Sequence, residues 1–110
     1  MMDKYKQYAS ICALTDYADK KSVRRHNQAA NAMIKIVEQA TQEGLPSIER
    51  LFPLLDDPIC AKWLAFQLLE RAKVNSDIKT KCLKIIGSIA TGEGATAFGA
   101  KTWLNKWNAN

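Results

Sequence analysis

The stretch Leu51–Leu69, LFPLLDDPICAKWLAFQLL, constrains the fold of this chain more than any other. An apolar run stops at two aspartates, and Pro58 opens a second segment that is apolar on nearly every side. Asp57 is a good helix N-cap, because its carboxylate can accept from free backbone N–H groups, and Pro58 suits the first helical position. A helix that is apolar all round has neighbours on several faces. We therefore predict a buried central helix over Pro58–Ala72, with Trp63 in the core.

The remaining apolar residues recur at helical spacing, and no alternating run indicates a strand. The helices that we predict beside the central one are Asp3–Ala18, Val23–Gln42, Ser47–Leu55, Ser76–Ile89 and Ala95–Trp107. The boundary between the first two stays open, so the chain has five or six helices. The prediction is all-α.

Local signals predict where these helices begin and end. Ser22 and Ser47 are candidate N-caps, as is either Asn75 or Ser76 for the helix that follows the central one. Gly44 is expected to end the second helix. Pro53 lies inside the short third helix and predicts either a kink or a distorted last turn there.

Length and composition indicate one ordinary globular domain, 1–110. The chain has 110 residues, of which 47% are apolar and 25% charged, and such a length buries a core without metals or disulfides. The sequence shows neither a membrane-length apolar run nor a signal peptide, so we expect a cytoplasmic protein. Cys12, Cys60 and Cys82 lie on apolar stripes, where reduced, buried thiols are expected.

The net charge of +5 is unevenly distributed. Residues 1–36 carry +4, residues 37–60 carry −4, and residues 61–110 carry +5. An acidic stretch between two basic ones weakens the case for a single nucleic-acid footprint, although folding could bring the basic parts together.

The short loops and paired helices resemble helical repeats. Two successive pairs, 45–72 and 76–107, follow the N-terminal helices at 1–43, and stacked two-helix units build solenoids. Leu51–Leu69 looks like a HEAT or armadillo-type repeat. PLLDDP, Trp63, and the tail IATGEGATAFGAKTWLNKW make the chain similar to a family of small bacterial ARM/HEAT-like proteins of unknown function.

This resemblance implies an α-α superhelix that acts as an interaction scaffold. Families of this kind include proteins that resemble immunity partners of secreted bacterial toxins. The most specific function that the resemblance implies is therefore neutralisation of a toxin. HEAT-type repeats usually carry an arginine early in the second helix, where this chain has Ala61 followed by Lys62. Fold by itself does not fix function.

No residue pattern points to catalysis, a metal or a cofactor. His26 is the only histidine, and we interpret it as a surface or partly packed residue. The cysteines lack the CxxC-type spacing of zinc sites, and the glycines at 92 and 94 form no phosphate-binding motif. We expect a non-enzymatic protein without cofactors.

The prediction that remains is binding. We expect a protein partner on a groove or face formed by Val23–Gln42, Pro58–Ala72 and Ala95–Trp107. The alternative is nucleic acid bound by a basic face with stacking aromatics. We interpret Trp103 and Trp107 mainly as covering the end of the solenoid, and otherwise as a partner anchor. The candidate partner-binding residues are Lys20, Lys21, Arg24, Arg25, Lys62, Arg71, Trp103 and Trp107.

Overall fold

The computed structural model describes residues 2–109, and these form helices and no strand. The elements are α1 (Met2–Ala13), α2 (Lys20–Glu43), α3 (Leu45–Glu49), the 3-10 helix η1 (Phe52–Asp56), α4 (Pro58–Arg71), α5 (Ser76–Ala90) and α6 (Ala95–Ala109). The all-α prediction is confirmed, and the first two helices are separate. Within the described residues, none of these helices combines the length and the apolar character needed to cross a membrane.

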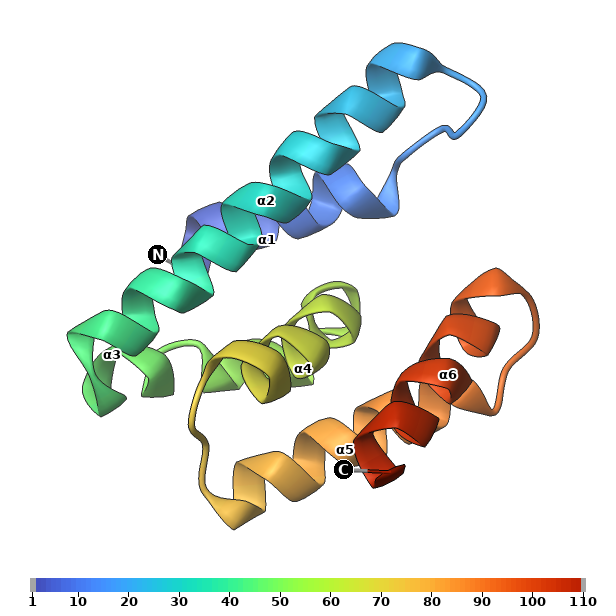
Figure 1. Ribbon diagram of the computed structural model, residues 1–110. Helices are drawn as coiled ribbons and strands as arrows, with labels where there is room; N and C mark the ends of the chain where they lie inside the picture. The colour runs from blue at the N-terminus through green and yellow to red at the C-terminus, as the bar shows by residue number, and fades with distance from the viewer. Residues whose placement is uncertain (1, 110) are drawn as a thin grey trace.

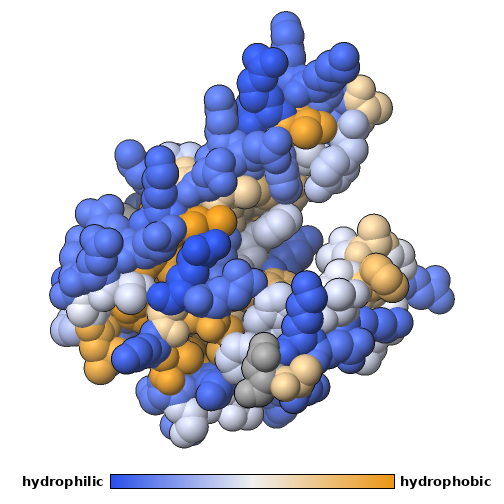
Figure 2. Space-filling model, in the orientation of Figure 1, coloured by the Kyte–Doolittle hydropathy of each residue, from blue (hydrophilic) through white to orange (hydrophobic). Residues whose placement is uncertain are grey.

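Two helical hairpins flank α4 (Figure 1). The α1–α2 hairpin lies on one side and the α5–α6 hairpin on the other, and α4 packs against α1, α2, η1 and α5. The loops that close the two hairpins lie on the same side of the molecule, and α4 begins between them. The space-filling view shows an opening between the ends of the two hairpins (Figure 2).

The start of α4 follows the sequence prediction. The Asp57 side chain accepts from the backbone N–H of Ile59 at 2.9 Å and of Cys60 at 3.3 Å, and Pro58 takes the first helical position. Six residues of α4 are buried. The prediction for Trp63 was wrong in part, because this residue is half-buried rather than inside the core. The reason is the opening, which leaves one flank of α4 without a covering helix.

The α1–α2 connection differs from the prediction. The first helix ends at Ala13 instead of Ala18, because the loop satisfies its own backbone groups. The Asp16 carboxylate accepts from the N–H of Ala18, and the Ser22 hydroxyl accepts from the N–H of Asp16. With Ser22 engaged in this way, Asp19 is the N-cap of α2.

The predicted helix Ser47–Leu55 is divided into α3 and η1. Pro53 cannot donate a backbone hydrogen bond, and the chain adopts the tighter 3-10 form around it. Ser47 is not the N-cap, since α3 begins directly after Gly44 and the Ser47 hydroxyl donates to Glu43.

The other predicted ends are close to those observed. Gly44 ends α2 with a φ of 111°, which is the region that favours glycine. Asn75 caps α5 through its side-chain oxygen, which accepts from the N–H of Ile78. The last helix continues to Ala109, two residues beyond the predicted end at Trp107.

One buried hydrogen bond joins α1 to α4. The Tyr5 hydroxyl donates to the side-chain oxygen of Gln67, and the Tyr5 side chain is completely buried. Gln67 is the buried polar residue of the core within residues 2–109. Because a buried acceptor without a donor costs free energy, this bond fixes how α1 lies on α4.

We predict that Tyr5→Phe lowers the free energy of unfolding by about 1–3 kcal/mol, because Gln67 is left with a buried, unpaired oxygen. Urea unfolding followed by circular dichroism measures the change. Tyr8→Phe is the matched control, since Tyr8 is half-buried and its hydroxyl makes no hydrogen bond within residues 2–109. Equal losses in the two variants would contradict the prediction.

Candidate binding groove

Aromatic side chains from three helices form a row across the opening. We call His26 of α2, Trp63 and Phe66 of α4, and Trp103 and Trp107 of α6 the aromatic row. The row contains all three tryptophans of the chain. It joins the same three helices for which the sequence predicted a binding face.

Ring contacts join the members of the row in two groups, and Trp63 and Phe66 line the same hollow between these groups. The His26 ring meets Trp63 edge-on, with 5.8 Å between ring centroids, and Phe66 meets Trp103 edge-on at 5.4 Å. Trp103 and Trp107 are stacked at 5.2 Å, as their spacing of four on one helix allows. Tyr17, from the α1–α2 loop, extends the row with a 5.9 Å contact to His26.

An apolar hollow of about 210 Å³ lies beside the middle of the row. Its walls come from α4, the end of α5 and the first half of α6. The lining residues are Lys62, Trp63, Phe66, Ile89, Thr96, Gly99 and Ala100. Gly99 leaves the hollow open, because a Cβ at this position would meet no atom within 4 Å.

Exposed apolar residues gather in the segments that border the opening. Leu14 is 83% exposed and Tyr17 is 72% exposed in the α1–α2 loop, Ile59 is exposed in the first turn of α4, and Phe98 is 72% exposed in the first turn of α6. Figure 2 shows the molecule hollowed between the α1–α2 arm and the α5–α6 lobe. These residues leave single apolar side chains open to solvent in the segments on both sides of the opening.

The polar groups at the row are mostly cationic. Lys62 lines the apolar hollow, and the Lys79 ammonium lies 5.6 Å from the centroid of the Trp107 ring. Neither lysine forms an ion pair with a carboxylate of residues 2–109. Glu70 is the acid at the row, and its carboxylate accepts from the indole N–H of Trp103 at 2.8 Å. The Trp63 indole N–H is buried without a partner in the described chain.

The predicted basic residues lie in different parts of the fold. Lys20, Lys21 and Arg24 are exposed in the first turns of α2. Arg25 lines a separate hollow of about 300 Å³ between α1 and α2, with Tyr8 and Ile11. Figure 1 places the starts of α2 and α5 at opposite ends of the molecule, so the α2 cluster is remote from Lys79.

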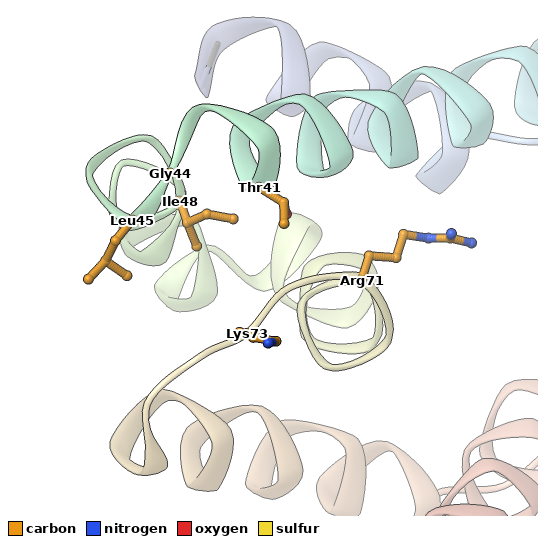
Figure 3. Close-up of a pocket in the computed structure, with 6 residues that line it drawn as sticks. All are labelled: Thr41, Gly44, Leu45, Ile48, Arg71 and Lys73. Carbon is orange, nitrogen blue, oxygen red and sulfur yellow. The ribbon is translucent and has the colours of Figure 1, made fainter.

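Arg71 lines a third hollow, of about 380 Å³, between the ends of α2 and α4. Figure 3 shows Arg71 extending away from Leu45 and Ile48, so the polar and apolar groups of this hollow do not converge. The Arg71 guanidinium lies 3.9 Å from Glu38, an exposed pair that contributes little stability. Of the eight predicted residues, Lys62, Trp103 and Trp107 are therefore the ones at the groove.

The reactive side chains are held in packed surroundings. The His26 Nδ1 lies 3.0 Å from the Thr15 hydroxyl, and its ring is enclosed by Tyr17 and Trp63. Burial raises the pKa of the Cys60 and Cys82 thiols to about 11, and a raised pKa makes a thiol a poor nucleophile. No group of three or more His, Cys, Asp or Glu within residues 2–109 is placed to hold a metal ion.

These thiols predict a loss of stability in alkali. Their ordinary pKa is 9.0, and burial raises the folded-state values of Cys60 and Cys82 to about 11. Their stabilising contribution is complete below pH 9 and is lost as the pH rises through about 11, because the unfolded chain releases the protons first. Urea unfolding at several pH values between about 9 and 11 measures how steeply the free energy of unfolding falls with pH. Cys82→Ala should have a shallower slope, and an unchanged slope would contradict the assignment.

The aromatic row joins the three helices of the predicted binding face, but sequence reasoning did not predict that Trp63 lies at the groove. Trp63 was assigned to the core, and His26 was not connected with it. The signal that was available is the spacing of Trp63, Phe66 and Glu70, which lie on one flank of a helix at i, i+3 and i+7. Nothing in the local sequence shows which flank the fold leaves uncovered.

No protein-family model matches this chain, and no curated protein or solved structure shows significant similarity to it. The resemblance to HEAT-like proteins therefore stays a prediction.

Proposed function

We propose that this protein is a non-catalytic interaction module that binds a protein partner in the groove between α2, α4 and α6. The observation that carries the proposal is the aromatic row, whose half-buried rings from three helices lie beside an unfilled apolar hollow. Aromatic residues dominate the energetics of protein interfaces, and a groove between helices is a common place for a partner segment.

The size of the hollow favours a protein segment over a small molecule. Small-molecule pockets enclose about 300–1,000 Å³ and bury most of the ligand, whereas the hollow measures about 210 Å³ and is open on one side. A volume of this size suits one large side chain of a partner. The exposed residues Tyr17, Ile59 and Phe98 then extend the contact beyond the hollow.

We propose further that the architecture is a short helical repeat of the HEAT type. In favour of it are three successive antiparallel units, α1–α2, α3/η1–α4 and α5–α6, in which neighbouring units share a packed face. A toxin-neutralising role is the form of partner binding that the resemblance implies. It stays a prediction, since no contact in the groove identifies a toxin.

Filling the hollow tests the proposal without unfolding the protein. Gly99→Leu places a side chain in the open space at Gly99 and raises helix propensity by about 0.8 kcal/mol. Gly87→Leu is the matched control, because Gly87 is also helical, has equally open space and does not line the hollow. We expect both variants to unfold at or above the wild-type temperature.

The readout is photo-crosslinking in lysate of the source cells, with crosslinked proteins quantified by mass spectrometry. A partner of the groove should crosslink to the wild type and to Gly87→Leu, and its recovery should fall about tenfold or more with Gly99→Leu. Identical crosslinking profiles for the three proteins would contradict a binding role for the hollow.

Nucleic acid is the second candidate, favoured by the lysines beside an aromatic row. Binding of this kind depends steeply on salt, since each phosphate contact releases counterions. Fluorescence anisotropy of labelled duplex DNA and single-stranded RNA over a salt series measures it. Micromolar affinity that falls steeply with salt would promote this candidate, and we expect no binding even at low salt.

A further inference from the structure

The charge around the apolar hollow points to the chemistry of the partner. We propose that the groove binds an acidic peptide segment that inserts one large apolar side chain between Lys62 and Gly99. This inference rests on the proposed function and deepens it, because it states what the partner must present.

The hollow defines the apolar anchor. Trp63, Phe66 and Ile89 are the large apolar side chains of its lining, and a Cβ added at Gly99 would meet no atom within 4 Å. Such a lining stabilises a buried hydrocarbon or ring and disfavours a buried charge. One side chain of about the size of leucine or phenylalanine is the group that the hollow can enclose.

The rim defines the charge of the flanking residues. Lys62 stands at the hollow itself and Lys79 at the far end of the row, and neither is neutralised by a carboxylate of residues 2–109. The neighbouring acid, Glu70, is engaged with the Trp103 indole. Carboxylates of the partner on either side of the anchor would therefore meet positive charge, which raises the association rate and rejects basic partners.

Several acids of residues 37–60 lie away from the hollow or are paired with other cations. Glu43 and Glu49 belong to the end of α2 and to α3, at the end of α2 opposite to the α1–α2 loop (Figure 1). Glu38 lies close to Arg71, and Asp56 pairs with Lys81 at 2.7 Å.

The row favours a peptide over stacked bases. Base stacking needs open ring faces beside a track of cations. Trp103 and Trp107 instead stack on each other with 12° between their planes, and Phe66 presents its edge to Trp103. A row of cations that bound phosphates along α2 would include Arg25. This residue instead lines the separate hollow with Tyr8.

A random-peptide phage library, selected on the immobilised full chain, identifies what the groove accepts. We expect the enriched peptides to share one large apolar residue flanked by Asp and Glu. Synthetic copies of them should change the fluorescence of the protein, because all three tryptophans lie in the row. Their affinity should fall about tenfold or more for Lys62→Glu and for Gly99→Leu, and should be unchanged for Gly87→Leu.

Reversing the charge at Lys62 and in the peptide together gives the most specific test. Peptides in which the acids are replaced by lysines should bind Lys62→Glu better than they bind the wild type. Lys20→Glu is the matched control for net charge, since Lys20 is exposed at the start of α2 and does not line the hollow. It should leave the affinity for acidic peptides nearly unchanged.

The other outcomes would overturn the inference, and they distinguish its failure from failure of the proposed function. Neutral or basic peptides that still require an open hollow at Gly99 would overturn the acidic partner and leave the proposed function standing. Acidic peptides that bind Lys62→Glu and Lys20→Glu equally would show only a net-charge effect. The absence of any peptide sensitive to Gly99→Leu would overturn both proposals. Displacement of bound peptide by single-stranded RNA at moderate salt would assign the row to nucleic acid.

Discussion

Every other part of this structure depends on the burial of α4 between the two hairpins. Asp57 and Pro58 fix where the helix begins, and six buried residues hold it against α1, α2, η1 and α5. Hydrophobic burial does not depend on direction, so it does not by itself fix how α1 lies on α4. The buried hydrogen bond from Tyr5 to Gln67 fixes this orientation. Because neither hairpin covers the flank of α4 that carries Trp63 and Phe66, this flank is left as the floor of a groove.

The groove is a consequence of this packing rather than of a separate functional element. The α1–α2 and α5–α6 hairpins both contact α4, and their closing loops remain apart at the end where α4 starts. Trp63 and Phe66 therefore meet His26 on one side and Trp103 on the other without being enclosed. The aromatic contacts order these rings in advance, which would reduce the entropy lost on binding the proposed partner.

Much of the fold was predictable from local residues. The N-cap at Asp57, the glycine at Gly44 and the cap at Asn75 act through backbone hydrogen bonds over a few residues, so the sequence displays them directly. The errors arose where local signals competed. Asp16 and Ser22 form a loop that ends α1 early, and Pro53 divides a predicted helix in two.

The sequence by itself determined an all-α chain, its central helix and the three helices that carry the aromatic residues, because periodicity and capping are local properties. Only the tertiary structure decided that Trp63 lies at a groove, that Lys62 stands beside an open hollow, and that Arg25 and Arg71 lie elsewhere. The physical reason is that exposure depends on which helix flanks remain uncovered. That is set by the packing of residues distant in sequence, such as Tyr5 against Gln67.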